Sequence, residues 1–193
     1  MSENKSISEF INEVDNIYGL YFDCITGFYH WEKKFTDIQN QLIKTNPGLT
    51  IEERDKLSFY YGDEDPSLPG AQALHSTTQG DLKERIKKEG KNYRDIASAC
   101  LVFIYQYWED FYREKIAREN GVNKNQIIWD IMGDISALRH SIIHNHGILS
   151  KKVLKCKKIN GFQPGERICL TREQMKEIVK IIKSTIFSIN HED

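Results

Sequence analysis

Three of the chain's six histidines lie in one short segment, residues 139–147, together with an arginine. The segment contains Arg139, His140, His144 and His146. Imidazole groups gain and lose protons near neutral pH, and a guanidinium group binds phosphate oxygens with a planar fork of N–H donors. These residue types therefore suit proton transfer at a phosphodiester.

The position of this segment at the end of an apolar helix pattern limits what one chain can do. Successive helical residues are about 100° apart, so His140 and His144 share a face, whereas Arg139 and His144 differ by roughly 140°. One undistorted helix cannot direct Arg139 and His144 at the same atom. We expect either that the helix loosens near Asn145 or that a second copy of the chain completes the site.

Two interpretations without catalysis remain open for the same residues. Histidine and arginine are favoured at the negative end of a helix dipole, and Asn145 and Gly147 are of types common at helix ends. His140, His144 and His146 could instead chelate zinc, but no Glu follows His140 as in H-E-x-x-H, and no nearby carboxylate completes the set. We therefore predict no metal site and no cofactor.

Aromatic side chains are concentrated in residues 105–113. We expect them to pack in the core or on a dimer face, with Glu109 and Arg113 forming an i,i+4 ion pair. The alternative gives Glu109 or Asp110 a supporting role, in which the carboxylate reaches across the bundle to hold Arg139 or a histidine. Spacing does not distinguish these interpretations.

Lysines are concentrated just after the histidine segment. From residue 147 to residue 170, five lysines and one arginine face a single acid, whereas six acids face two bases from residue 50 to residue 70. The lysines could contact an RNA backbone, because phosphate contacts position a nucleic acid without reading its sequence. They could instead keep a strand edge from pairing between molecules. They are Lys151, Lys152, Lys155, Lys157 and Lys158.

Helical periodicity dominates the elements that must position these residues. Apolar residues recur at steps of three and four along four long segments, and capping patterns such as Thr171 with Gln174 precede several of them. The long helices are expected over residues 6–46, 92–120, 123–147 and 171–189, with capping patterns also at Ser6, Thr50, Asn92 and Asn123. In the second of these, the expected apolar stripe is Ile96, Cys100, Phe103, Tyr107 and Phe111.

Between the long helices the sequence predicts smaller elements. Short helices are expected after Thr50 and over residues 81–89, an irregular loop over about 62–80, and a basic hairpin over about 152–170, where turn residues separate two short apolar runs. The predicted fold class is all-α: a helical bundle of about four long helices with a small β-hairpin inserted before the last helix.

Length and composition indicate one ordinary globular domain covering residues 1–193. The chain has a formal net charge of -1 and 39% hydrophobic residues. Its longest mainly apolar stretch, residues 97–105, is too short for a membrane span, and the first residues do not form a secretion signal. We therefore expect a cytoplasmic protein with no membrane partner. The cysteines are far apart and are expected to be reduced thiols: Cys24, Cys100, Cys156 and Cys169.

Residues 139–144 resemble the R-x4-6-H motif of the HEPN superfamily of helical-bundle proteins. In that motif an arginine is followed by Asn, His or Asp, three further residues and a histidine, and here Arg139, His140 and His144 fit this form. His146 also falls within the wider spacing, so the second position is ambiguous between His144 and His146. The likeness covers this motif in detail and the helical architecture in outline.

The resemblance implies a homodimer in which the motifs of both subunits meet in one cleft and act as a metal-independent RNA endonuclease. Members are often toxins or phage-defence effectors, which adds an antitoxin or a defence protein to the partners to be considered. By analogy, His144 would be the general acid or base, Arg139 would stabilise charge on the phosphoryl group, and His140 would orient or bind. In one branch a Tyr that the antitoxin modifies stands two residues after the His, whereas this chain has His146 there.

A second hypothesis assigns the chain to a different functional class. It is a HEPN-like binding module whose bundle and histidines, with Asn145 among them, recognise a nucleic acid, a nucleotide or a protein without cutting. The sequence contains no Gly-rich phosphate loop, no G-x-S-x-G elbow and no carboxylate cluster for two metals, which disfavours nucleotide hydrolases and metal-dependent nucleases.

Overall fold

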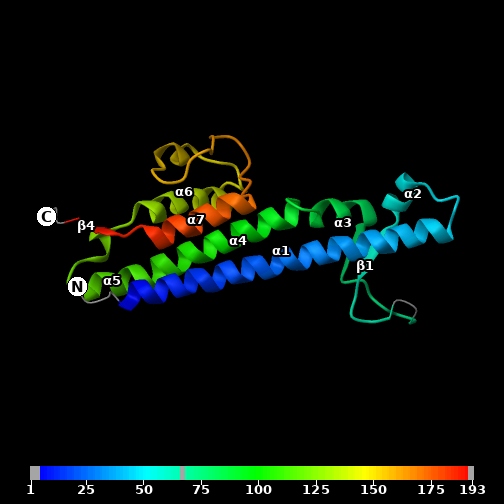
Figure 1. Ribbon diagram of the computed structural model, residues 1–193, viewed down its shortest axis with the longest axis horizontal. Coiled ribbons are helices and arrows are strands. Elements are labelled where there is room, and N and C mark those ends of the chain that lie inside the picture. The colour runs from blue at the N-terminus through cyan, green and yellow to red at the C-terminus, as the bar shows by residue number, and fades with distance from the viewer. Residues whose placement is uncertain (1–4, 66–67, 191–193) are drawn as a thin grey trace. The chain divides into compact units, whose positions relative to one another are not determined.

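The computed structural model describes residues 5–65 and 68–190 of the chain (Figure 1). Helices dominate these residues, which confirms the mainly helical fold. Two small antiparallel sheets, β1–β2 and β3–β4, accompany them. In chain order the elements are α1 (Lys5–Thr45), α2 (Ile51–Lys56), β1 (Ser58–Tyr61), β2 (His75–Thr78), α3 (Gln79–Ile86), α4 (Lys91–Tyr107), the π-helix η1 (Trp108–Tyr112), α5 (Arg113–Glu119), the 3₁₀-helix η2 (Lys124–Gln126), β3 (Ile127–Ile128), α6 (Asp130–His144), the 3₁₀-helix η3 (Lys151–Lys155), α7 (Arg172–Ser184) and β4 (Ser188–Ile189).

The contacts group the chain into two compact units. Unit 1 comprises Met1–Asp23 and Arg94–Asp193, and unit 2 comprises Cys24–Tyr93. The long helix α1 contributes residues to both units. No helix among the described residues combines the length and hydrophobicity needed to span a membrane.

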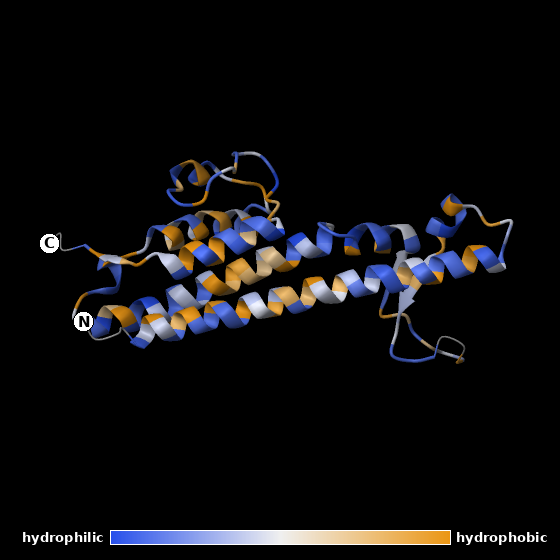
Figure 2. Cartoon of the chain, in the orientation of Figure 1, coloured by the Kyte–Doolittle hydropathy of each residue, from blue (hydrophilic) through white to orange (hydrophobic). Residues whose placement is uncertain are grey.

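Unit 1 has an aromatic core at one end and an aliphatic core along its helices. The Phe10 ring lies 5.5 Å from that of Trp108 and 5.9 Å from that of Trp129. Apolar bands run along α4 and α7 in Figure 2. The side chains that are fully removed from solvent include Val14, Leu101, Ile104, Ile135, Leu138, Met175 and Ile182.

Unit 2 has a smaller core beneath the β1–β2 sheet. Phe35, Leu82 and Ile86 are buried there, and the partly buried Trp31 and Phe59 pack against them. The predicted cap at Thr50 is present, because its hydroxyl accepts a hydrogen bond from the backbone N–H of Glu53 while the Glu53 carboxylate accepts from the backbone N–H of Thr50.

The predicted hairpin at residues 152–170 is wrong. Residues 151–155 form the 3₁₀-helix η3, the rest of the segment is irregular, and one isolated bridge joins Ile148 to Arg167. The reason is a competing hydrogen-bond acceptor: the buried Asp134 carboxylate accepts from the backbone N–H groups of residues 157, 158 and 159. These donors are therefore satisfied without a strand partner.

The predicted loop at residues 62–80 also contains regular structure. β2 pairs with β1, with Tyr61 opposite His75, and α3 begins at Gln79. The Thr78 hydroxyl accepts from the backbone N–H of Asp81 and so caps α3. A hairpin with a long connection therefore replaces much of the expected irregular segment.

Several helix boundaries differ from the prediction. Ser6 does not cap α1; it lies within the helix and its hydroxyl donates to Glu119 Oε1 at 2.6 Å. The helix expected from residue 123 begins at Asp130, since the Asn123 cap closes only a 3₁₀ turn before β3 pairs with β4. α7 ends at Ser184, and Ile186 is 78% exposed.

The expected stripe on α4 is wrong in its second half. Phe103, Tyr107 and Phe111 are exposed, and the buried face instead consists of Ala97, Cys100, Leu101, Ile104 and Trp108. Apolar residues occur on nearly every turn of this segment, so the spacing is compatible with two different buried faces. The packing buries the face that carries the aliphatic side chains and the indole.

Candidate functional site

Helix α6 carries the histidine motif and stays regular to its last residue. Its buried side chains include Ile131, Ile135 and Leu138, and the helix continues to His144, with Asn145 as its C-cap. The backbone N–H of Asn145 donates to the Ser141 carbonyl at 3.2 Å, and that of Gly147 donates to the same oxygen at 2.9 Å. The helix therefore does not loosen before His144.

His140 and His144 form a pair on one face of α6, as helix geometry requires. Their ring centroids are 5.0 Å apart and their planes are inclined by 46°. Partial desolvation lowers the pKa of His140, and the nearby charges of Lys152, His144 and Arg139 lower it further. His144 is the more exposed of the two rings. The neutral form of His140 is thus favoured beside a more accessible imidazole.

The Arg139 guanidinium is directed toward Tyr105 of α4, although its charge is near enough to His140 to lower that histidine's pKa. The guanidinium carbon lies 5.9 Å from the centroid of the Tyr105 ring. The Arg139 Nε is buried and has no hydrogen-bond partner. Within one chain, Arg139 and His144 therefore lie in different surroundings. A site that uses both residues needs a second copy of the chain or a movement of the Arg139 side chain.

His146 belongs to the turn that follows α6. Its backbone is left-handed, with φ of 50°, which is uncommon for a residue other than glycine, and Gly147 follows with φ of 79°. The His146 carbonyl accepts a hydrogen bond from Arg167 Nη1 at 3.0 Å. The Arg167 side chain therefore holds the turn directly after the histidine pair.

The lysine-rich loop runs back along α6, so its lysines do not all lie near the motif (Figure 1). The backbone N–H of Ser150 donates to the Ser141 hydroxyl, whereas Lys157 Nζ lies 2.8 Å from Asp130 Oδ1 at the start of α6. This ion pair raises the pKa of Lys157. Asp130 and His144 are roughly 20 Å apart along the helix, at about 1.5 Å per residue.

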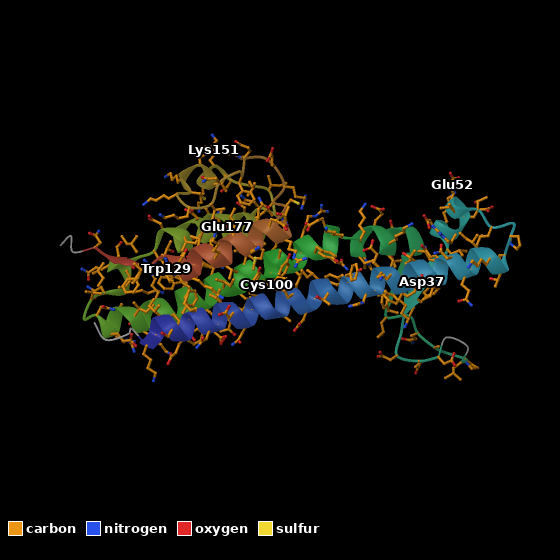
Figure 3. All side chains as sticks on the ribbon, in the orientation of Figure 1. Asp37, Glu52, Cys100, Trp129, Lys151 and Glu177 are labelled. Atoms are coloured by element: carbon orange, nitrogen blue, oxygen red, sulfur yellow. The ribbon has the colours of Figure 1, made fainter. Side chains whose placement is uncertain are left out.

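Two lysines of this loop therefore lie near opposite ends of α6. Lys152 is close enough to His140 to affect its pKa, while Lys157 pairs at the far end of the helix. Lys151, Lys155 and Lys158 are exposed, and Figure 3 shows Lys151 on this loop. Only part of the lysine set therefore lies where it could assist chemistry at the histidines.

Asp134 anchors the middle of the loop. It is 3% exposed, and its oxygens lie 2.6 to 2.9 Å from the backbone nitrogens of residues 157–159. The Cys156 thiol lies beside it, and burial together with the Asp134 carboxylate raises the pKa of that thiol to about 11. A single carboxylate therefore fixes the path of the lysine-rich segment against α6.

The two acids considered as supports for the motif have other partners. The Glu109 carboxylate contacts Arg113 Nη1 at 3.1 Å and Lys124 Nζ at 2.9 Å. The Asp110 carboxylate accepts a hydrogen bond from the Gln106 amide. The i,i+4 pair of Glu109 with Arg113 is confirmed, and both acids are occupied within their own part of the chain.

Two contacts at the site were missed from the sequence. Asp134 interrupts an apolar face that includes Ile131 and Leu138, and a lone acid at such a position could have signalled a buried acceptor. No comparable signal links Tyr105 to Arg139, because the contact joins two helices distant in sequence.

Among the described residues, no group of three or more His, Cys, Asp or Glu side chains is arranged to hold a metal ion. Comparisons of the chain with protein-family models, with curated proteins and with solved structures found no match.

Proposed function

We propose that the chain is a metal-independent RNA endonuclease of HEPN type that acts in a toxin or phage-defence context. The observation that supports this most directly is the imidazole pair on α6, with ring centroids 5.0 Å apart. The neighbouring charge of Lys152 and the lowered pKa of His140 add to it. A neutral imidazole can accept a proton, and nearby cations attract a phosphate.

In this proposal the reaction is an internal transfer at the RNA backbone. His144 removes the proton from the ribose 2′-hydroxyl, whose oxygen attacks the phosphorus and expels the 5′-oxygen. A second imidazole in its protonated form, from His146 or from the other copy, protonates that leaving oxygen, while the neutral His140 orients or binds. Arg139 stabilises the extra negative charge on the phosphoryl oxygens. The products are a 2′,3′-cyclic phosphate and a 5′-hydroxyl.

A homodimer is part of the proposal, because Arg139 and His144 lie on different faces of α6 within one chain. The unpartnered Nε of Arg139 supports it, since a rearrangement around a second copy could supply an acceptor. The exposed row Phe103, Tyr107 and Phe111 supplies apolar surface on α4 and η1 for an interface. Light scattering at micromolar concentration should therefore give a dimer; an active monomer would refute the shared site.

Cleavage of mixed RNA by the purified protein in EDTA tests the chemistry. We expect cleavage to persist, with cyclic phosphate ends, and to fall at least about 10²-fold in Arg139→Ala and in His144→Ala. His30→Ala, which removes an exposed histidine of unit 2, should retain wild-type activity. Wild-type rates in both motif variants would reject the assignment, and dependence on added metal would favour chelation by the histidines.

A second candidate function is binding without cleavage by a HEPN-like module. The specific observation in its favour is that Arg139 packs on Tyr105 rather than beside His144. In that case RNA should bind without new ends being formed, and His144→Ala should alter affinity alone.

A further inference from the structure

Three polar side chains from three elements of unit 2 meet at one end of the β1–β2 sheet. Tyr61 and His75 are opposite each other in the antiparallel register, and their ring centroids are 5.6 Å apart. Arg85, from α3, has Nη1 3.1 Å from His75 Nε2, and its Nη2 donates to the Tyr61 hydroxyl at 3.4 Å. Its guanidinium carbon lies 5.9 Å from the centroid of the Tyr61 ring.

The core of unit 2 positions this cluster. Phe59 lies two residues before Tyr61 and therefore on the same face of β1, where it packs on the buried core. Leu82 and Ile86 bury one face of α3 and flank Arg85 in sequence. The three polar groups are consequently held at the rim of a packed core, with Tyr61 and His75 exposed.

The positive charge of Arg85 has no carboxylate partner among the ion pairs of the described residues. Its two hydrogen-bond partners are a phenol and an imidazole, and the imidazole nitrogen that accepts from a guanidinium must be unprotonated. Residues 83–91 hold five bases and two acids, with Lys87 paired to Glu84. Residues 63–65, just after β1, are three acids. The cluster therefore combines the positive charge of Arg85 with exposed rings.

We propose that Tyr61, His75 and Arg85 form a contact for single-stranded RNA in unit 2. Arg85 binds a backbone phosphate with its remaining N–H donors, and the exposed rings support an adjacent base. Single-stranded nucleic acids are held by this combination of cationic groups and stacking surfaces. The choice of RNA over DNA rests on the proposed function, whereas the phosphate and base contacts do not.

Fluorescence anisotropy with a labelled single-stranded 12-residue RNA tests the contact, with His144→Ala as the parent so that the probe is not consumed. Arg85→Gln keeps a hydrogen-bonding side chain but removes the charge. It should weaken binding about tenfold and lower the slope of log affinity against log salt by roughly 0.7. The affinity of Arg85→Lys for the RNA should lie between that of the parent and that of Arg85→Gln. Lys44→Gln makes the same charge change on an exposed residue of α1 and should stay within twofold of the parent.

A variant of the tyrosine separates RNA contact from mere support of the sheet. Tyr61→Phe keeps the ring and loses the hydroxyl partner of Arg85, so affinity should stay within twofold, whereas Tyr61→Leu should weaken binding. Equal affinities and salt slopes for Arg85→Gln and Lys44→Gln would overturn the proposal. A tenfold loss of RNA affinity in Tyr61→Phe would also overturn it, as would a parent that binds no RNA. A loss confined to Arg85→Gln and Tyr61→Leu would sustain it even if the wild-type protein cuts no RNA.

Discussion

Two arginines of this chain lie over tyrosine rings at the same distance, 5.9 Å, yet their surroundings differ. Arg85 in unit 2 also contacts an imidazole and a phenol. Arg139 in unit 1 lies over Tyr105 with a buried Nε that has no acceptor. A buried donor without a hydrogen-bond partner lowers the free energy of unfolding by about 1–3 kcal/mol. The ring contact alone therefore identifies neither site, whereas the unsatisfied donor marks Arg139 as the arginine that would gain most from a new acceptor.

The largest expected difference between the two arginines is in the chemical step. In single-turnover cleavage at saturating RNA, Arg139→Ala should lose at least about 10²-fold in rate because it removes charge stabilisation from the transition state. Arg85→Ala should keep nearly the full rate, since saturation compensates for weaker binding. Equal losses in the two variants would remove the distinction between a reacting and a binding arginine.

A second difference between unit 1 and the unit 2 cluster concerns how much single polar side chains stabilise the fold. Asp134→Asn should lower the free energy of unfolding by roughly 2–4 kcal/mol, because an amide cannot accept the full set of backbone N–H groups and brings donors of its own. Urea denaturation measures this change. Asp37→Asn, at an exposed position of α1 (Figure 3), should change stability by less than about 0.5 kcal/mol. His75→Ala at the unit 2 cluster should also have a small effect; a large one would show that the cluster is structural.

The smallest expected effect is on the titration of His140. Its pKa is lowered in the folded chain, so its NMR titration should have a midpoint at lower pH than in the urea-unfolded chain. Lys152→Gln removes a nearby positive charge and should raise this pKa, but only in part, because desolvation is the larger cause. Lys44→Gln is the control for a general change in charge. If the titration midpoint of His140 did not change in Lys152→Gln, the lysine-rich loop would lie farther from the motif than in the structure.

The sequence predicted the helices better than the loops, and the reason is physical. The C-terminal end of α1 and the caps at Thr50 and Thr171 depend on residues within a few positions, and they were found at those places. The hairpin at 152–170 failed because its backbone donors bond to Asp134, about 23 residues away at the nearest. Local patterns do not contain such distant partners.

The candidate site was predictable in part for the same reason. The shared face of His140 and His144 follows from helix geometry alone, and their ring contact agrees with it. The contact of Arg139 with Tyr105, and the return of the loop that brings Lys152 near His140 but Lys157 to Asp130, depend on packing between separate elements. The Arg85 cluster also joins three elements.

The π-helix η1 affects how the chain tolerates a change in its length. Residues 108–112 form one wide turn between α4 and α5, and such turns hold one residue more than an α-helical turn. Removal of a residue here, such as the exposed Phe111, would convert the turn to α-helix and leave Trp108 and Ile116 facing the core. Removal of a residue within α6 would instead rotate all that follows by about 100° and turn the histidines to another face. The two helices therefore differ in the deletions that a descendant of this chain could accept.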